Sequence, residues 1–445
     1  MSLLVLALAT TSCKKEETPP VTNVVTPAPT FTGITVEGDI NSNTTWTAAQ
    51  KYKVKGFVYV KSGVTLTIEP GTIIFGDKDS KGTLIVERGG KLEAAGTASQ
   101  PIVFTSAEKK GERNYGDWGG IIICGKAPVN LPGGEGTLEG GTGAVFGGND
   151  PADNSGTLRY VRLEFGGIAY QPNNEINGLT MGGVGSGTTI EYIQISYCGD
   201  DAFEWFGGNV NAKYLISHRT WDDDFDTDNG FTGKIQFGYV LRDPNIADQS
   251  GSNGFESDND GQGTDATPFT APVFSNITVA GPLSAAGVTI AANYRRAVHV
   301  RRNSRQSIYN SVLAGYPTGI LLDGSKCETN ATQGLLNFAN VVLAGHTANF
   351  AVASGSTWDL AAWYNTTAFS NTVQADFAGL NMGGIFNLTA PDVLPGTGSS
   401  LLTGADFSAT QLTNSFFTQT TYKGAFGTTN WTTGWTQFDP QNADY

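Results

Sequence analysis

Residues 200–204 read DDAFE, and the same arrangement of acidic residues around a Phe returns at 222–226 as DDDFD. The offset between these copies is 22 residues, and a looser third copy, SNGFE, follows at 252–256 after an offset of 30. A repeat of this length is typical of solenoids, in which each coil stacks on the preceding one. We expect a loop insertion at 244–251 to absorb the longer third offset.

Short alternating segments surround this repeat, at 57–60, 64–68, 72–75, 83–87, 91–94 and 102–105, and each ends at a Gly or Pro turn. With 58 Gly and only 15% charged residues, the 445-residue chain has the composition of an all-β protein rich in turns. No segment shows the helical period over a useful length, so we expect almost no helix.

The segments TLTIEPGT (65–72), GGKL (89–92), PIVFTS (101–106) and WGGI (118–121) resemble the first coils of secreted right-handed β-helix proteins. The resemblance implies three short strands per coil and three parallel sheets around a narrow core. We therefore predict a single-stranded right-handed parallel β-helix over residues 36–390. The aromatic-rich segment at 391–445, which contains YKGAFG at 422–427, is predicted to cap the last coil, because an open parallel edge would aggregate.

Stacking of the three repeat copies places their Phe residues inside and Glu204, Asp226 and Glu256 outside, about 4.8 Å apart along the axis. Further acidic residues crowd the same region: Asp200, Asp201, Asp222, Asp223, Asp224, Asp228, Asp258 and Asp260. Like charges at this spacing repel one another, so cations, basic neighbours or raised pKa values must relieve the repulsion.

The N-terminus has the features of an export signal. Residues 3–9 form an apolar run too short to span a bilayer, and small residues follow it directly before Cys13. This arrangement resembles a lipobox, which implies that the Cys13 thiol is diacylated and that Cys13 becomes the mature N-terminus once residues 1–12 are removed; a plain secretory signal is the alternative. No Lys or Arg precedes the apolar run, so we expect the true start upstream.

Residues 14–17, KKEE, are similar to the signal that sends Bacteroidota-type lipoproteins to the outer leaflet of the outer membrane. We therefore expect the protein to face the cell exterior. Residues 14–35 are rich in Pro and Thr and are predicted to form an extended tether.

A wider resemblance covers nearly the whole mature chain. It rests on EWFGG (204–208), DDDFDTDNG (222–230), GKIQF (233–237), GFESDN (254–259) and the C-terminal segment. Together these segments resemble a family of bacterial surface lipoproteins of uncharacterised activity. The resemblance implies the fold and the location of the protein, and it identifies no catalytic residues.

The acidic region suggests a calcium site, since hard cations take six to eight oxygen ligands and adjacent coils can supply them. The candidate ligands are Asp222, Asp223, Asp224, Asp226, Asp228, Glu256 and Asp258. An EF-hand is rejected, because residues 222–230 lack the closing Glu and flanking helices. The alternative is a solvated acidic surface without a bound ion.

Two enzymatic functions also use such residues. A polygalacturonase-like hydrolase would draw its acid and base from Asp200, Asp201, Asp223 and Asp224, with Trp205 and Trp221 stacking on sugar rings. However, the Gly-His-Gly and Arg-Ile-Lys segments of that family are missing. A polysaccharide lyase would use Arg301 as base beside calcium. The structural alternative, which we favour, is that Arg295, Arg296, His299, Arg301 and Arg302 pair with carboxylates across coils.

A binding protein accounts for the sequence best, because it needs no catalytic set. We expect an extended ligand, a glycan or nutrient, to be captured and presented to an outer-membrane transporter; adhesion to a surface and binding of a partner outer-membrane protein are the alternatives. The predicted ligand-binding residues are Glu204, Trp205, Trp221, His299, Arg301 and Arg302.

The net charge of −14 argues against nucleic acid as a partner, and three His without a Cys-x-x-Cys pair argue against a transition metal. We expect no organic cofactor, and we expect Cys124, Cys198 and Cys327 to be free thiols.

Overall fold

A computed structural model describes residues 31–171 and 174–445 of the chain. Residues Gly33–Tyr445 form one compact unit, which contains the whole of the architecture described below. The predicted signal peptide, Cys13 and most of the predicted tether lie outside the described residues. The first strand begins at Ile34, two residues before the predicted start of the β-helix.

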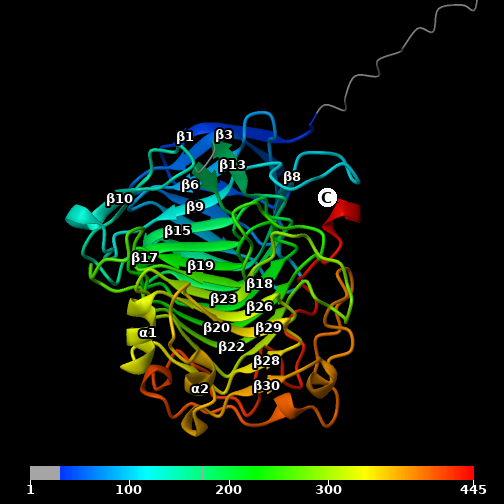
Figure 1. Ribbon diagram of the computed structural model, residues 1–445. Coiled ribbons are helices and arrows are strands. Elements are labelled where there is room, and N and C mark those ends of the chain that lie inside the picture. The colour runs from blue at the N-terminus through cyan, green and yellow to red at the C-terminus, as the bar shows by residue number, and fades with distance from the viewer. Residues whose placement is uncertain (1–30, 172–173) are drawn as a thin grey trace, which may run out of the picture. The chain divides into compact units, whose positions relative to one another are not determined.

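The unit is a right-handed parallel β-helix with three sheets, as predicted (Figure 1). The first sheet contains β6 (Thr83–Val86), β9 (Gly120–Cys124), β15 (Leu179–Val184), β17 (Phe203–Gly208), β19 (Phe225–Asp228), β21 (Phe255–Ser257), β23 (Arg296–Arg301), β26 (Thr318–Asp323) and β29 (Ala348–Val352). The second contains β2 (Thr44–Trp46), β4 (Thr65–Ile68), β7 (Lys91–Ala95), β24 (Ser307–Tyr309) and β27 (Phe338–Ala339). The third contains β5 (Ile73–Gly76), β8 (Ile102–Ser106), β25 (Val312–Ala314), β28 (Val342–Ala344) and β30 (Thr372–Gln374).

Seven longer strands bend from one sheet into another. β1 (Ile34–Ile40) and β3 (Lys51–Val60) join the third sheet to the first. The strands β12 (Gly156–Glu164), β16 (Thr189–Ser196), β18 (Ala212–His218) and β20 (Lys234–Leu241) join the second sheet to the third, as does β22 (Val273–Ala280) at the next coil. Two antiparallel hairpins project from the coils: β10 (Glu135–Thr137) with β11 (Val145–Gly147), and β13 (Ile168–Gln171) with β14 (Asn174–Ile176).

The core follows the register that the repeat predicts. Phe203 lies directly opposite Phe225, which lies directly opposite Phe255, and all three are fully buried. Their ring centroids are 5.7 and 5.2 Å apart, within the range in which aromatic rings attract one another. Stacking of equal side chains thus fills the axis of the β-helix over three coils.

A second aromatic column marks the bend between the second and third sheets. Tyr160, Tyr192, Tyr214 and Phe237 all have positive φ, between 49° and 63°, a conformation that is unfavourable for such residues. Their rings stack at 4.3, 4.2 and 5.0 Å, and this packing offsets the backbone cost. Asn residues, which tolerate this conformation better, continue the column in later coils.

The C-terminal segment is aromatic-rich, as predicted, but its position differs from the prediction. Residues 380–445, here called the strap, run back along the outer faces of the second and third sheets toward the first coils (Figure 1). Gln236 exchanges two hydrogen bonds with the backbone of Thr418, at 2.7 and 2.8 Å, and Gln194 does the same with Gln437. The strap therefore covers a flank of the β-helix and not its last coil.

The last coil is closed by a different segment. Helix α2 (Leu360–Tyr364) follows β29, and its buried residues Leu360 and Tyr364 belong to the main core. A second short helix, α1 (Ser325–Thr332), follows β26. Among the described residues, no helix is long and apolar enough to cross a membrane. The predicted insertion is present as the long connection at 242–254 between β20 and β21.

The Phe column generates a stability prediction. Changing Phe225 to Ala should lower the free energy of unfolding by about 3–5 kcal/mol, because it opens a cavity between two coils that cannot collapse independently. Phe225→Leu, which keeps most of the volume, should cost less than about 1.5 kcal/mol. Urea unfolding followed by circular dichroism measures both variants, and equal losses in the two would contradict the proposed role of the aromatic stack.

Candidate cation and ligand site

The predicted outward column of acidic residues is present on the first sheet. Glu204 on β17 lies directly opposite Asp226 on β19, which lies directly opposite Glu256 on β21. On the next coil His299 of β23 continues the column. Because the three Phe residues one position earlier point into the core, strand alternation directs these side chains outward.

More acidic residues lie at the corner that precedes each strand. Asp200 and Asp201 come before β17, and Asp222 and Asp223 come before β19, one coil later. The Asp201 side chain accepts a hydrogen bond from the backbone N–H of Asp223 at 2.7 Å. Asp223 in turn accepts one from the backbone N–H of Asn253. Each carboxylate is thus fixed by the backbone of the coil above it.

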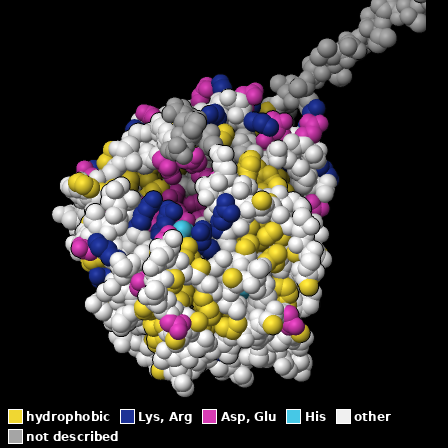
Figure 2. All heavy atoms as spheres, in the orientation of Figure 1, with side chains coloured by type: hydrophobic (Ala, Val, Ile, Leu, Met, Phe, Trp, Pro, Cys, Tyr) yellow, Lys and Arg dark blue, Asp and Glu magenta, His cyan; other side chains and the backbone are white. Residues whose placement is uncertain are grey.

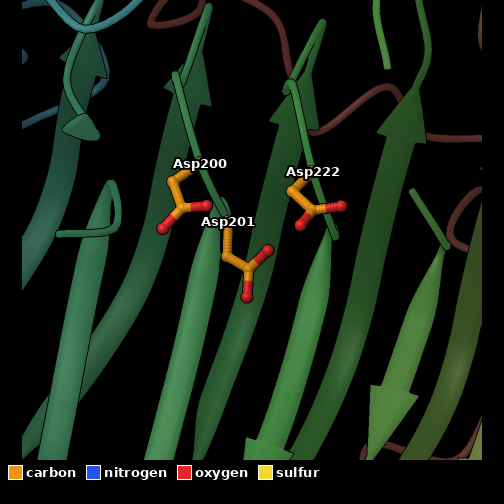
Figure 3. A group of neighbouring side chains, drawn as sticks. All are labelled: Asp200, Asp201 and Asp222. Carbon is orange, nitrogen blue, oxygen red and sulfur yellow. The ribbon is translucent and has the colours of Figure 1, made fainter. Parts of the chain in front are cut away.

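These two sets form one cluster of seven carboxylates in three overlapping triplets. The triplets are Asp200–Asp201–Asp222, Asp201–Glu204–Asp226 and Asp223–Asp226–Glu256, and the oxygen atoms of each triplet lie within 4.8 Å of one another. Figure 3 shows Asp200 and Asp222 on adjacent coils, with Asp201 beside them. We call these seven residues the carboxylate cluster.

The carboxylate cluster is not a solvated surface. Asp201, Glu204 and Asp223 are only 8%, 7% and 4% exposed. Acidic side chains gather in a hollow, with Lys and Arg side chains along its margin (Figure 2). The alternative of a solvated acidic surface is therefore wrong for the centre of the cluster.

Burial and mutual repulsion raise the pKa of most members of the cluster. Burial is the largest cause in each case, and neighbouring carboxylates add to it. The pKa lies well above its ordinary value for Asp200, Asp201, Glu204, Asp223 and Asp226. Burial raises the pKa of Asp222 to about 6. A large part of the negative charge is therefore uncompensated by the protein's own residues.

Among the described residues, the ion pairs between basic side chains and the cluster lie at its Glu256 end. Arg301 contacts Glu256 and also Asp258, its Nε lying 2.7 Å from Asp258 Oδ1, and Arg302 contacts Asp258 at 2.7 Å. His299 lies between Glu256 and Asp323, at 3.1 and 3.2 Å. Burial raises the pKa of Glu256, but the His299 hydrogen bond and the Arg301 charge outweigh burial and leave that pKa below its ordinary value. The predicted pairing of basic residues with carboxylates across coils is confirmed for these residues.

Two predicted site residues lie elsewhere. Trp205 is fully buried against Phe231, 5.3 Å between ring centroids, so the prediction that it stacks on a ligand is wrong. The alternation that directs Glu204 outward directs Trp205 inward. Asp224 forms a fully buried ion pair with Arg242 at 3.0 Å, so its predicted roles as a calcium ligand and as a catalytic acid are also wrong.

The remaining predicted residues lie around the cluster. Asp228 and Asp258 belong to none of the triplets among the described residues, although Asp258 borders Glu256 through Arg301. Burial, followed by the charge of Asp258, raises the pKa of Asp228 to about 7. Trp221 is 40% exposed and lies immediately before Asp222.

The sequence did not indicate two residues that complete the site. Asn177 donates a hydrogen bond to Glu204 and accepts one from the N–H of Asp201, so it occupies the equivalent position one coil earlier. Extension of the repeat by one more coil would have found it. Glu139 comes from the segment between β10 and β11, and burial, then the charge of Glu175, raises its pKa to about 7. No sequence signal connects Glu139 with this site.

A comparison with protein families agrees with this architecture. A model described as a pectate-lyase-like β-helix domain matches residues 38–388, most of the chain. The chain belongs to the pectate-lyase-like β-helix family. No curated protein and no solved structure matches it. Membership establishes the fold, and because one fold supports many activities, function has to be argued from the site.

In this member of the pectate-lyase-like family, the donor atoms of the cluster suit a hard cation. All of them are carboxylate oxygens, which Ca²⁺ prefers and which soft transition metals do not. One of them, Asp222 Oδ1, is buried and has no hydrogen-bond partner among the described residues. Residues of all three triplets can therefore supply ligands to one or more calcium ions.

The raised pKa values predict how stability depends on pH. Without a cation, the protein should lose stability as pH rises from about 4, the ordinary carboxyl pKa, to about 7. In this range the carboxyl groups of the folded state still hold protons that the unfolded chain has released. Deprotonation of these groups therefore costs more free energy in the folded state than in the unfolded chain. Thermal unfolding in a chelator between pH 4.5 and 8 measures the effect, and saturating calcium should remove much of it.

The comparison with and without calcium at each pH is the control for this experiment. Burial lowers the pKa of His218 to about 3, and this group acts in the opposite direction as pH rises. Calcium does not alter that contribution. Melting temperatures that show the same pH dependence with calcium and with chelator would contradict a cation at the cluster.

Proposed function

We propose that the protein is a lipid-anchored protein of the bacterial outer surface that binds an extended glycan through calcium held by the carboxylate cluster. The observation that supports this proposal is the cluster itself: seven carboxylates, largely withdrawn from water, whose ion pairs with basic side chains lie only at one end in the described part of the chain. Such an arrangement binds divalent cations and leaves the hollow open to a ligand.

The size of the repulsion supports a bound cation. Two unit charges 4.8 Å apart repel by about 3 kcal/mol at the effective dielectric constant of a protein surface. Several such pairs occur in the cluster, and raised pKa values relieve them only by keeping protons on the carboxyl groups at the pH of most habitats. A divalent ion relieves the same repulsion without protons and also contributes binding energy.

Calcium also provides a way to bind a glycan. The ion accepts six to eight oxygen ligands in a flexible arrangement, so the hydroxyl or carboxylate oxygens of a sugar can complete its coordination. The flank of a β-helix is long and suits an extended chain. We infer that the ligand is then passed to an outer-membrane transporter or retained at the cell surface.

A polysaccharide lyase is the second candidate, and the surroundings of Arg301 argue against it. Proton abstraction requires a base that gives up its proton readily. Burial lowers the pKa of Arg301, but the charges of Glu256 and Asp258 outweigh burial and raise that pKa above its ordinary value. Arg301 therefore keeps its proton and acts as a positive partner of the carboxylates, which favours binding over cleavage.

Calcium binding can be tested directly. Millimolar calcium should raise the melting temperature of the protein by a few degrees, because the ion binds only the folded state. A variant with Asp223→Asn and Asp226→Asn should lose this shift, and its melting temperature in chelator should not fall, because the substitutions also remove repulsion.

The matched control is Asp228→Asn, which removes a half-buried carboxylate from the strand that carries Asp226 but from none of the triplets. This variant should keep the calcium shift. An identical calcium shift in the double variant and the wild type would overturn the proposed cation site.

The lipid anchor is a separate prediction. In the bacterial host, Cys13→Ala should release the protein from the membrane fraction, because the diacylated thiol is the expected attachment. Detergent partitioning measures release, and protease treatment of intact cells measures surface exposure. Membrane retention of the Cys13→Ala variant would contradict lipid anchoring at this residue.

A further inference from the structure

A pocket of about 570 Å³ lies beside the carboxylate cluster and is not used by the proposed cation site. Its side-chain walls are formed by Tyr115, Ile168, Trp221, Asp248, Gln249 and Asn293. Ala247 and three glycines complete the lining, so the remaining space is bordered mainly by backbone. The volume suits one or two rings of a small-molecule ligand.

An aromatic wall is the first feature that identifies the ligand. Trp221 is among the few large apolar side chains that are strongly exposed, at 40%. Its ring packs against Tyr115 in a T-shaped arrangement, with 5.8 Å between ring centroids, and the Tyr115 ring centroid lies 5.3 Å from that of Tyr197. These contacts hold Trp221 in place while part of it stays open to the pocket. A fixed and exposed indole is a flat apolar platform with a polar edge.

Polar side chains are the second feature. Asp248, Gln249 and Asn293 line the same pocket. The side-chain amides of Gln249 and Asn293 make no hydrogen bond with any residue the structure describes, so they are free to bind a ligand. A flat apolar platform in the same pocket as free amides and a carboxylate matches a pyranose ring, which has a C–H face and a hydroxyl edge.

The charge around the pocket determines which sugars fit. Asp248 lines it, and the Ser250 hydroxyl lies within hydrogen-bond distance of both Asp248 and Asp222, a member of the carboxylate cluster. The lining of the pocket contains no Lys or Arg. An acidic sugar or a phosphate would meet uncompensated negative charge here, whereas a neutral sugar would not.

We propose that this pocket is a subsite for a neutral pyranose unit, stacked on Trp221, next to the cation-dependent part of the glycan site. The inference deepens the proposed function and rests on it, because it assumes that the bound ligand is a glycan. It assigns to Trp221 the positioning of one sugar ring. Asp248, Gln249 and Asn293 bind its hydroxyl groups, which fixes the register of the chain relative to the calcium ligands.

The test compares the wild type with Trp221→Ala, Trp221→Phe and Leu335→Ala in calcium. Leu335→Ala is the matched control, since Leu335 is also an exposed apolar residue, at 39%, outside the pocket lining. The probes are cellohexaose, xylohexaose, mannohexaose, maltohexaose and hexagalacturonate, titrated by calorimetry. Calcium-dependent melting is measured for every variant.

We expect at least one neutral hexasaccharide to bind, with affinity at least tenfold weaker in Trp221→Ala and nearly unchanged in Trp221→Phe and Leu335→Ala. All variants should keep the calcium shift, because Trp221 belongs to none of the triplets. Wild-type affinity in Trp221→Ala, binding of hexagalacturonate alone, or binding of no probe would each overturn the subsite.

The same measurements distinguish failure of the calcium proposal from failure of the sugar subsite. Binding that depends on Trp221 in a protein without a calcium shift would support the subsite and reject calcium. A calcium shift without binding of any neutral probe would support calcium and reject the subsite.

Discussion

Stacking of equivalent residues at the spacing of paired strands is the constraint on which the rest of this structure depends. Residues of paired strands lie directly above one another in successive coils, so a residue type that recurs in the repeat forms a column along the axis. Inside, the repetition is favourable, since Phe203, Phe225 and Phe255 attract one another and exclude water. Outside, the same geometry brings like charges together. A β-helix therefore cannot carry repeated acidic residues on its surface without a compensating charge.

The chain compensates its acidic columns in two ways. At the Glu256 end, Arg301 and Arg302 supply positive charge from the following coil, His299 lies within hydrogen-bond distance of Glu256, and the pKa of Glu256 falls below its ordinary value. At the Asp200 end no basic residue plays this part among the described residues, and the pKa values rise. The contrast arises within one sheet and a few coils. The unpaired end is thus a local feature, separate from the negative charge of the whole chain.

The sequence predicted those parts of the molecule that follow from the repeat. The offsets between the acidic motifs predicted the Phe column, the outward column of Glu204 and Asp226, and the long connection before β21. The sequence could not predict contacts between the coils and segments that lie outside the repeat. Glu139 reaches the cluster from a distant hairpin, and the strap binds Gln194 and Gln236 through backbone atoms that carry no sequence signature. Trp205 was a different kind of error, since alternation along β17 already placed it inside.

The uncompensated end of the cluster is best explained by what an Arg there would prevent. A guanidinium group beside Asp201 or Asp226 would neutralise the repulsion, but it would also occupy the carboxylate oxygens and fill the hollow. A calcium ion neutralises the same oxygens and keeps coordination positions for a ligand. The two ends of the cluster then have different roles: the paired end holds neighbouring coils together, and the unpaired end, next to the pocket of Trp221, stays able to bind. Placing the stabilising pairs one coil away from the binding oxygens lets the β-helix keep both on a single continuous sheet.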